Sequence, residues 1–597
     1  MHNRVPVLIV GGGAAGLATS MLLSRLGVET LLIERRTTTS MLPKAHILNQ
    51  RTMEVFRQAG LADAIYDQGA PIDMMSRTAW YTSLGSPSEL HGRCVGAIDS
   101  WGGGGLMPEY DASSPCRITN LPQHWLEPLM LTRAQKSSSA TIRFQHELVD
   151  LRQDERGVTA TVAASDTGET YEVEADFVVA ADGGRTVGAL LDMTMSGERG
   201  LVKMISTHFS ADLSRSLPDP SVAIYRFVNP DGRGLEHRGT LVQMGGGGWG
   251  LECREWIYTF SVRPGEPVSF DEHEILGSLR TTLGLPDLEA TVHRISPWNV
   301  EGVVADEYRI GRVFFAGDAA HRHPPAGGLG LNTAIQDAHN LAWKLAAVLN
   351  GQAGDALLDS YASERRPIGL TNVTQALQSF YQNQEVDRAL GFTADMAPNE
   401  GWGILRRFFQ ATEDDPARNA VAEAIRTKRH AYQAHGLELG FHYDRGALVA
   451  EPVPSVRLDD PVCRYVPSSR PGHRLPHSWL TDRDGQRLST LDLIDGSTFV
   501  LLVDPRGGVA WEAELARLRS EQPTIPIEMI SIGGDGDYEN ADEWDELREV
   551  SSAGAILVRP DAHVAWRSSD APGHEGALVD ALTRVLEPEI VDVGVRR

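Results

Sequence analysis

The sequence predicts an α/β protein with a parallel, doubly wound sheet at its N-terminus, an inserted antiparallel sheet and a further α/β domain at its C-terminus. Three observations support this fold class. An apolar run at residues 7–10 leads into a glycine-rich turn and a helix, and apolar runs that end in Asp-Gly or Gly-Asp recur near residues 180 and 315. Short alternating stretches lie between these motifs. Beyond residue 476, predicted strands alternate with predicted helices.

Composition excludes several classes of partner. The chain has 597 residues, too many for one hydrophobic core, and a net charge of -25. We expect so acidic a surface to repel nucleic acid and anionic membranes. The four cysteines form no C-x-x-C pair, and no apolar stretch is long enough for a membrane span. We therefore expect a cytoplasmic protein without a disulfide framework and without a metal site.

The first glycine-rich turn is typical of dinucleotide-binding folds. Residues 7–10 read as a buried parallel strand, and residues 11–16 fit G-x-G-x-x-G. Gly11 permits the tight turn, and Gly13 lets the backbone approach a pyrophosphate. Gly16 lets the following helix pack closely on the strand. A strand before the motif and a helix after it make an empty glycine turn the weaker interpretation.

The residues that follow the glycines complete this predicted site. Ala14 and Ala15 open the helix, whose N-terminus offers free N–H groups to phosphates. Glu34 ends the second predicted strand, where its carboxylate can accept hydrogen bonds from an adenosine ribose. We include its neighbour Arg35 among the cofactor-binding candidates. This motif alone does not separate FAD from NAD.

Two later strands end in acidic turns. Residues 176–184 read DFVVAADGG, and residues 313–321 read VFFAGDAAH before a loop rich in proline and glycine. A helix follows that loop, and we expect Asn332 to cap its start. The candidate residues at the two turns are Asp182, Gly183, Gly317 and Asp318. Taken singly, such residues are common turn formers, but with the first motif they indicate one extended nucleotide site.

Four segments make the chain resemble the single-component FAD-dependent aromatic hydroxylases, which share the fold of p-hydroxybenzoate hydroxylase. They read KAHILNQRTMEVFR, YDASSPCRITNLPQHWLEPLM, FFAGDAAHRHPPAGGLGLNTAIQDAHNLAWKLAAVLNG and ILVRPDAHVAWR. The chain is most similar to the phenol hydroxylase type, which includes the 2,4-dichlorophenol 6-monooxygenases. The resemblance implies FAD as cofactor, NADPH or NADH as co-substrate, and a small aromatic substrate that reacts with O2.

The resemblance also implies roles for individual residues. Asp318 would bind the ribityl chain of FAD, and backbone N–H groups of residues 330–332 would face the flavin pyrimidine edge. The other implied cofactor-binding residues are Arg51, Gln123, Asp182, Gly183, Gly317 and Pro325, beside Gly330, Leu331 and Asn332 themselves. Arg51 can instead be interpreted as a surface helix residue, and Gln123 as a partner for local backbone groups. The family continues D-G-x-x-S-x-V-R, but this chain reads DGGRTVGA and lacks the arginine.

His46 is the candidate catalytic residue. It precedes Arg51 by five positions, where a related group of phenol hydroxylases has a carboxylate. Our hypothesis is that His46 hydrogen-bonds or deprotonates the substrate hydroxyl, because an imidazole has a suitable pKa. The alternative is a structural residue on the loop after the second strand.

These inferences predict a monooxygenase. The resemblance implies that NAD(P)H reduces FAD and that reduced flavin forms a C4a-hydroperoxide with O2, which hydroxylates a phenol ortho to its hydroxyl. Two alternatives stay open. One is a hydroxylase of a larger aromatic, such as a polyketide or antibiotic intermediate. The other is a non-catalytic flavin-binding interaction protein.

The motif positions also predict domain boundaries. We expect an FAD-binding Rossmann-like domain at 1–75, 115–190 and 300–372, an antiparallel-sheet substrate-binding domain at 76–114 and 191–299, a helical segment at 373–450, a linker at 451–475, and a thioredoxin-like domain without C-x-x-C at 476–597. The resemblance implies the thioredoxin-like domain and a homo-oligomer, most simply a dimer.

Overall fold

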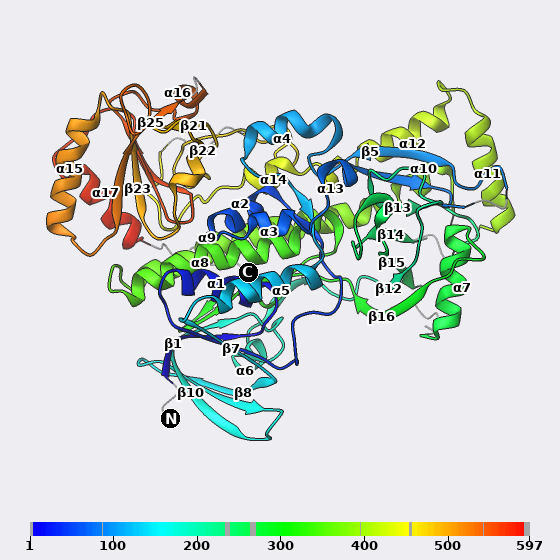
Figure 1. Cartoon of the computed structure of the whole chain (residues 1–597), viewed down its shortest axis with the longest axis horizontal. Coiled ribbons are helices and arrows are strands. Elements are labelled where there is room, and N and C mark those ends of the chain that lie inside the picture. Colours follow the sequence, from blue (N-terminus) through cyan, green and yellow to red (C-terminus); the bar gives the residue numbers. More distant parts are fainter. Residues whose placement is uncertain are drawn as a thin grey trace.

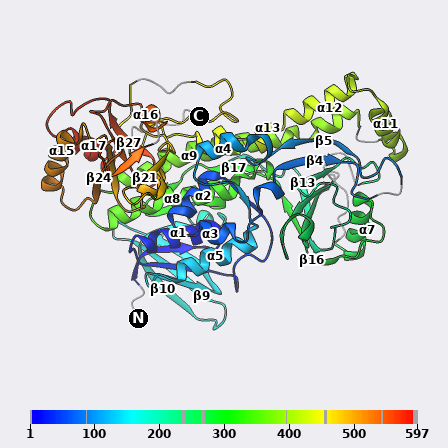
Figure 2. The same ribbon diagram turned by 45° about the horizontal axis from the view of Figure 1, so that its top comes forward.

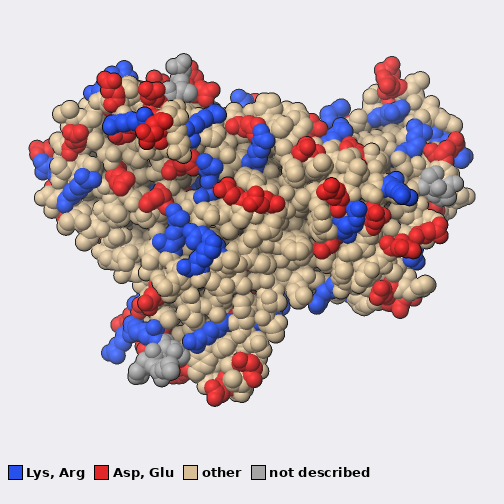
Figure 3. Space-filling view, in the orientation of Figure 1, with Lys and Arg blue, Asp and Glu red and all other residues tan. Residues whose placement is uncertain are grey.

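Two long helices run between three lobes of the chain. The computed structural model describes residues 4–85, 88–232, 239–262, 270–393, 396–452, 457–540 and 543–589. Helices α8 (Leu329–Leu349) and α9 (Ala356–Tyr381) lie between the N-terminal sheet, a second sheet and the C-terminal domain (Figures 1 and 2). On the face shown in Figure 3, acidic and basic side chains are interspersed, so the net negative charge forms no single patch there.

The first sheet brings four motif-bearing strand ends to one edge. Its main strand order is β18-β19-β10-β1-β2-β7, with β8 and β9 attached to β10. Strand β1 pairs in parallel with β2 and β10, and β10 pairs in parallel with β19. The strands are β1 (Arg4–Val10), β2 (Thr30–Glu34), β7 (Ala140–Phe144), β8 (His146–Gln153), β9 (Val158–Ala164), β10 (Thr170–Ala180), β18 (Arg309–Ile310) and β19 (Val313–Phe315). Parallel strands point their carboxyl ends to the same edge, where α/β folds bind ligands.

Buried apolar side chains hold the helices on this sheet. The apolar run of β1 is fully buried, as its composition predicted, and α1 packs against α8 and α5. The helices of this lobe are α1 (Ala14–Arg25), α2 (Gln50–Gln58), α3 (Ala62–Tyr66), α5 (Gln123–Gln135) and α6 (Val187–Leu190). Helix α8 is buried along most of its length, including Ile335, Ala338, Leu341, Ala342 and Leu345. Among the described residues, no helix combines the length and the apolarity that a membrane crossing requires.

The second sheet has two differently packed faces. Its order is β16-β12-β15-β14-β13-β4-β5, antiparallel except for the β13–β4 pair. Trp256 and Tyr258 pack beneath α7 on one face, whereas Ile224 and Val242 pack toward α11 and α12 on the other. The strands are β4 (Arg77–Tyr81), β5 (Cys94–Asp99), β12 (Lys203–Ser210), β13 (Val222–Phe227), β14 (Thr240–Gln243), β15 (Glu255–Val262) and β16 (Thr291–Asn299). The helices are α4 (Met107–Ser113), α7 (Glu272–Leu283), α10 (Glu385–Leu390), α11 (Pro398–Gln410), α12 (Pro416–Arg426), α13 (Arg429–Tyr432) and α14 (His435–Leu439).

Two features of the fold bear on the predicted domain boundaries. The boundary at 372/373 falls inside α9, which is continuous because its Pro367 does not end the helix. Residues 195–198 form β11, which pairs with β17 (Gly302–Ala305) rather than with the seven-stranded sheet. β17 also pairs with β20 (His321–Arg322), and a two-stranded sheet joins β3 (Ile47–Leu48) to β6 (Thr119–Asn120). These small sheets connect the lobes, and apolar periodicity does not reveal such connections.

The C-terminal domain contains a hairpin that the alternating pattern concealed. Its four-stranded sheet has the order β24-β23-β26-β27, and β26 and β27 are antiparallel neighbours. A strict alternation of strands and helices has no place for this hairpin, in which residues 559–563 form the turn. The elements are β21 (Trp479–Asp482), β22 (Arg487–Ser489), β23 (Phe499–Val503), α15 (Gly508–Glu521), β24 (Ile527–Ser531), β25 (Tyr538–Asn540), α16 (Glu543–Leu547), β26 (Ala555–Val558), β27 (Val564–Ser568) and α17 (Ala577–Leu586).

Fully buried charges join this domain to α8 and α9. The Glu364 carboxylate accepts hydrogen bonds from Lys344 Nζ at 2.7 Å and from Arg559 at 2.8 and 3.0 Å. Burial lowers the pKa of Lys344 to about 8. Burial opposes ionisation of Glu364, but Arg559 and Lys344 lower its pKa to about 2. Arg559 also pairs with Asp561, and all four side chains are essentially inaccessible to solvent.

Replacing Arg559 by alanine should loosen the C-terminal domain. The variant leaves Glu364 and Asp561 buried without their arginine, which costs about 3–5 kcal/mol in comparable buried pairs. We expect a lower thermal midpoint and faster tryptic cleavage between residues 451 and 475. The matched control is Arg517→Ala, because Arg517 pairs with acids at the surface. Equal protease resistance of Arg559→Ala and the native chain would contradict this role.

Candidate functional site

The G-x-G-x-x-G turn is shaped by two close backbone contacts. Gly11 has φ +111°, and a Cβ there would lie 2.4 Å from the carbonyl oxygen of Ala181. A Cβ on Gly16 would lie 1.9 Å from the Gly11 carbonyl oxygen, so glycine is needed where α1 contacts β1. The nearest atom to a Cβ on Gly13 is Glu127 Oε1 at 3.8 Å. The turn is therefore closely packed at Gly11 and Gly16 but has free space at Gly13. This space suits a pyrophosphate bound at the N-terminus of α1.

The start of α1 is free to bind an anion. Gly13 is the N-cap residue, and Ala14 and Ala15 form the first helical positions. No side chain caps this end, and its first turn contains no acid. Because the first N–H groups of a helix lack intrahelical acceptors, they are available to phosphate oxygens.

Glu34 lies beside this turn, at the end of β2. Its Oε2 accepts a 2.7 Å hydrogen bond from Gly12 N, and its Oε1 accepts one of 2.8 Å from Arg36 Nε. Burial raises the pKa of Glu34, but hydrogen bonds from Arg36 and Gly12 outweigh it and lower the pKa overall. Glu34 is therefore an ionised acceptor at the position predicted for ribose. Arg35 is half exposed and lies 3.7 Å from Glu147, so its role stays a prediction.

Gln123 approaches the same turn from α5. Its Nε2 donates a 2.6 Å hydrogen bond to Glu127 Oε1, the atom nearest to Gly13. Glu127 Oε2 accepts one of 2.6 Å from Ser40 N. Sequence reasoning missed Glu127, although its i+4 spacing from Gln123 on a helix was a usable signal.

The two acidic turns differ in their local contacts. The Asp182 carboxylate accepts hydrogen bonds from the backbone N–H groups of Gly184, Thr186 and Val187 at 2.6–3.0 Å. Asp182 therefore organises the turn before α6, and Gly183 within that turn has φ +76°. Asp318 is instead exposed to solvent just beyond β19. Gly317 has φ +61°, and its Cβ would crowd Ala15 and Ala334, so it holds Asp318 between α1 and α8.

The start of α8 is a second free helix terminus. Gly328 is the N-cap with φ +66°, no side chain caps this end, and its first turn contains no acid. Gly330, Leu331 and Asn332 lie within this turn, after the exposed Pro325. The expectation that Asn332 caps the helix is wrong, because the helix already begins at Leu329.

Asn332 instead ties this turn to β3. Its Oδ1 accepts a hydrogen bond from Asn49 N at 2.9 Å, and its Nδ2 donates to Ile47 O at 2.9 Å. The segment that carries His46 is thus fixed against the start of α8. This contact was absent from the sequence reasoning, because the two segments lie far apart in the chain.

A chain of hydrogen bonds orients His46. Its Nδ1 lies 3.2 Å from Asn120 Oδ1, and Asn120 Nδ2 donates to Gln243 O at 3.2 Å. The amide of Asn120 thus presents its oxygen to His46, which places the imidazole proton on Nδ1. Burial lowers the pKa of His46 to about 4. The ring is neutral at pH 7, and its Nε2 lone pair makes no hydrogen bond within the described part of the chain.

Arg51 lies in the first turn of α2, in the protein interior. Its guanidinium is buried, donating to Glu54 at 3.0 Å and to the carbonyl oxygen of Asp561 at 2.7 Å. Arg474 also pairs with Glu54. Arg51 is therefore not a surface residue, and its contacts join α2 to the C-terminal domain.

The described residues fit FAD. The uncapped N-termini of α1 and α8 both lie at the carboxyl edge of the first sheet. Ionised Glu34 lies near the start of α1, and exposed Asp318 lies between the two helices. A pyrophosphate suits the first terminus, and the negative charge of a reduced flavin ring suits the second. Glu34 and Asp318 are acceptors for ribose and ribityl hydroxyls. The site thus offers groups of the right chemistry to each part of the cofactor.

Comparisons with known proteins agree with this geometry. A family model described as FAD binding domain matches residues 4–376, and one described as aromatic-ring hydroxylase, C-terminal, matches residues 468–588. The 2,4-dichlorophenol 6-monooxygenase of Cupriavidus pinatubonensis is 35% identical, covering 97% of this chain and 96% of that protein. A putative polyketide hydroxylase of Streptomyces halstedii is 35% identical, covering 98% and 97%. The crystal structure of the flavin-dependent monooxygenase PieE with FAD and substrate has a TM-score of 0.92 and 38% identity, covering 98% and 99%.

Adding one methyl group at Gly16 should release the cofactor. In Gly16→Ala the new Cβ would collide with the Gly11 carbonyl oxygen, and such overpacking costs about 1–3 kcal/mol. We expect the Kd for FAD to rise roughly tenfold or more, measured by flavin fluorescence on reconstitution. Gly277→Ala is the control, because nothing lies within 4 Å of its new Cβ. Native affinity in Gly16→Ala would refute the close-contact argument.

Proposed function

The chain belongs to the family of FAD-binding aromatic-ring hydroxylases, and from this premise we propose that it hydroxylates a phenolic substrate, ortho to the hydroxyl, at the start of α8. The observation that carries the proposal is His46, a neutral imidazole whose Nε2 makes no hydrogen bond to the described residues and whose neighbour Ile47 is tied to the start of α8. Bound FAD supplies the redox and oxygen chemistry, and NADPH or NADH supplies the electrons.

The position of His46 suits contact with an aromatic ring. Its neighbour Ile47 belongs to an apolar cluster with Ile224, Val242 and Met244 of the second sheet. This face can hold a ring, while Asn332 holds residue 47 against the start of α8. A phenol placed here would have its ring on apolar side chains and its hydroxyl within reach of Nε2.

The pKa of His46 distinguishes two possible roles. A free phenol has a pKa of about 10, and that of His46 is about 4. Complete proton transfer across this gap would cost about 8 kcal/mol. We therefore assign His46 the role of hydrogen-bond acceptor. It draws the hydroxyl proton toward Nε2, raises electron density on the ring and orients the carbon that reacts.

A larger aromatic substrate is the second candidate. The similarity to a putative polyketide hydroxylase favours it. Trp80, Trp101 and Tyr432 extend the same apolar cluster beyond Ile47. A longer surface of this kind would bury several fused rings.

The finer architecture belongs to the same proposal. We propose that the seven-stranded sheet is the substrate-binding domain and that the C-terminal domain is thioredoxin-like with a structural or subunit-contact role. We further propose a cytoplasmic homo-oligomer, most simply a dimer. Arg51, Arg35, Gln123, Asp182, Gly183 and Pro325 remain proposed cofactor-binding residues.

Turnover assays distinguish the two substrate classes. We would follow NADPH oxidation under air for simple phenols and for polycyclic phenols, with hydrogen peroxide assayed in parallel. Simple phenols should stimulate oxidation with little peroxide. Tight coupling only with polycyclic phenols would favour the second candidate, and full peroxide yield with both would contradict phenol hydroxylation.

Removing the His46 imidazole should slow hydroxylation and increase the yield of peroxide. A hydrogen bond to a charged or developing-charge group contributes about 1.5–3 kcal/mol, so His46→Ala should lower kcat roughly 10- to 150-fold. The pKa of His46 is lowered to about 4, and protonation of Nε2 removes its ability to accept a hydrogen bond. The contribution of His46 to kcat is therefore present above pH 4 and is lost as the pH falls through that value. The pH dependence of kcat for the native enzyme should therefore show no titration of His46 between pH 6 and 8.

Two further variants test this assignment. Asn120→Asp keeps an oxygen opposite Nδ1 but adds negative charge, which raises the pKa of His46 and should move the acid limb to higher pH. His146→Ala is the matched control, because His146 lies on β8 and bonds only locally. Unchanged kcat and coupling in His46→Ala would exclude the imidazole from the reaction.

A further inference from the structure

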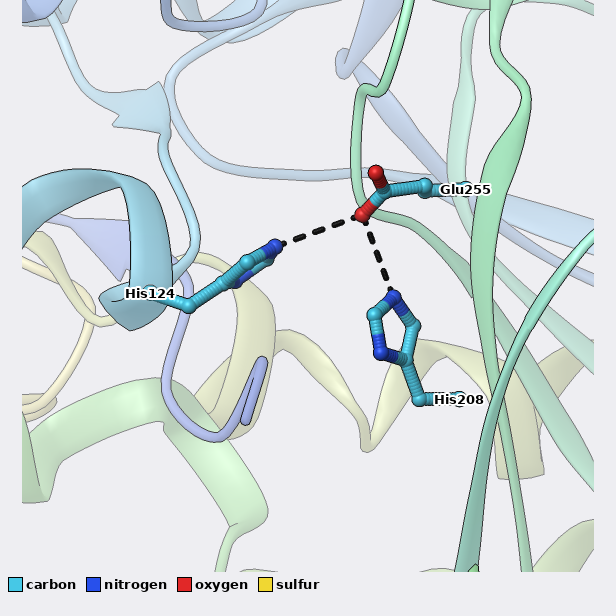
Figure 4. Close-up of side chains that lie close together, drawn as sticks. All are labelled: His124, His208 and Glu255. Atoms are coloured by element: carbon cyan, nitrogen blue, oxygen red, sulfur yellow. Dashed lines mark hydrogen bonds and ion pairs between the residues drawn. The ribbon is translucent and has the colours of Figure 1, made fainter. Parts of the chain in front are cut away.

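Two histidines and a glutamate converge where the two sheets meet. His124 lies in the first turn of α5, His208 on β12 and Glu255 at the start of β15. Figure 4 shows both imidazoles pointing at the same carboxylate oxygen. The distances to Glu255 Oε2 are 3.3 Å from His124 Nε2 and 3.1 Å from His208 Nε2. The three side chains come from distant segments and from both lobes.

These distances match the edges of a metal-centred tetrahedron. In zinc sites the ligand atoms lie about 2.0–2.1 Å from the ion, so neighbouring ligand atoms in a tetrahedron are about 3.3–3.4 Å apart. The two measured separations are within a few tenths of an ångström of this edge. All three ligand atoms lie within 4.8 Å of one another. A small movement of the side chains would admit an ion.

The ligand chemistry indicates which ion. Two imidazoles and one carboxylate suit Zn²⁺ and its first-row neighbours, whereas Mg²⁺ and Ca²⁺ prefer oxygen ligands alone. Among the described residues, no lysine or arginine forms an ion pair with Glu255. A metal ion would therefore meet no competing positively charged side chain at this carboxylate.

The tetraglycine segment makes room for Glu255. Gly245, Gly246, Gly247 and Gly248 all have positive φ. A Cβ on Gly246 would lie 2.4 Å from Glu255 Cγ, so any larger residue would displace the carboxylate. A glycine run such as this segment can serve as a flexible turn or as a close-approach site. It is a close-approach site that also turns, and the side chain it accommodates belongs to the histidine cluster.

We propose that His124, His208 and Glu255 form a binding site for one divalent transition-metal ion, with Zn²⁺ as the probe. Three protein ligands leave one coordination position open to water or to a small anion. Because one ligand comes from the flavin lobe and two from the seven-stranded sheet, the bound ion joins the two lobes across their interface. The site lies outside the residues assigned to FAD and to the phenol.

Zinc titration of the FAD-loaded, full-length enzyme tests this site. In chelator-treated buffer at pH 7.5, calorimetry should detect one site of micromolar or tighter Kd. Glu255→Gln keeps the size of the side chain but removes its charge, and His208→Ala removes a ligand. Each should weaken Zn²⁺ binding at least tenfold. Zinc should also raise the thermal midpoint of the native enzyme and not that of Glu255→Gln, because the ion joins two lobes.

Control variants separate this site from other histidines. His293→Ala removes a neighbouring imidazole that bonds to Ser210, and His430→Ala removes a second His–Asp–Cys cluster, in which Arg429 already pairs with Asp460. Both should bind Zn²⁺ as the native enzyme does. Bound FAD, read from its absorbance, verifies that each variant is folded.

Locating the bound ion tests the proposed site without relying on the variants. Anomalous diffraction at the zinc edge should place the ion between His124, His208 and Glu255. The proposal is overturned if the native enzyme binds no zinc, if the anomalous peak lies elsewhere, or if Glu255→Gln and His208→Ala bind zinc with native affinity. Activity is not part of this readout, so a failure of the phenol assignment would leave the test intact.

Discussion

Buried charges along α8 must be paired, and this constraint determines how the lobes meet. An unpaired ion in a protein interior costs several kcal/mol. Asp337 therefore binds His321 at 2.7 Å and Arg365 at 2.9 Å, and further along the helix Lys344 binds Glu364. These partners come from the β19–β20 region and from α9, and Arg559 adds the C-terminal domain. Helix α8 can hardly slide or rotate without breaking one of these pairs.

The chemistry of the site follows from this fixed helix. The first turn of α8 is held at the carboxyl edge of the first sheet, where Gly317 leaves space between α1 and α8. Asn332 then binds the backbone of residue 47, and Asn120 orients the neighbouring imidazole of His46. The positions that we propose for the flavin edge and for the substrate hydroxyl are thus linked by one continuous series of contacts. Such preorganisation is the main contribution a protein makes to cofactor chemistry.

The second sheet gives this family a surface that can vary. One face is filled by α7 and by large aromatic residues such as Trp256, and it stabilises the lobe. The other face is apolar near His46, and it also carries the polar group of His124, His208 and Glu255. Relatives that differ in substrate keep the whole length of the chain. Side chains on this face can therefore change the substrate while the flavin site stays constant.

Local patterns were sufficient wherever a function depends on a short segment. The strand–turn–helix at residues 7–25 and the strand ends near 180 and 315 follow from the sequence alone, because glycine and apolar periodicity act over a few residues. The choice of FAD followed from the resemblance of four segments to a known family. Four other features depend on segments more than 100 residues apart or on an unrecognised turn. They are the contact of Asn332 with β3, the burial of Arg51, the hairpin after Val558 and the convergence of His124 with Glu255. Only tertiary packing decides these, since a side chain's partner across the molecule leaves no periodic trace in its own neighbourhood.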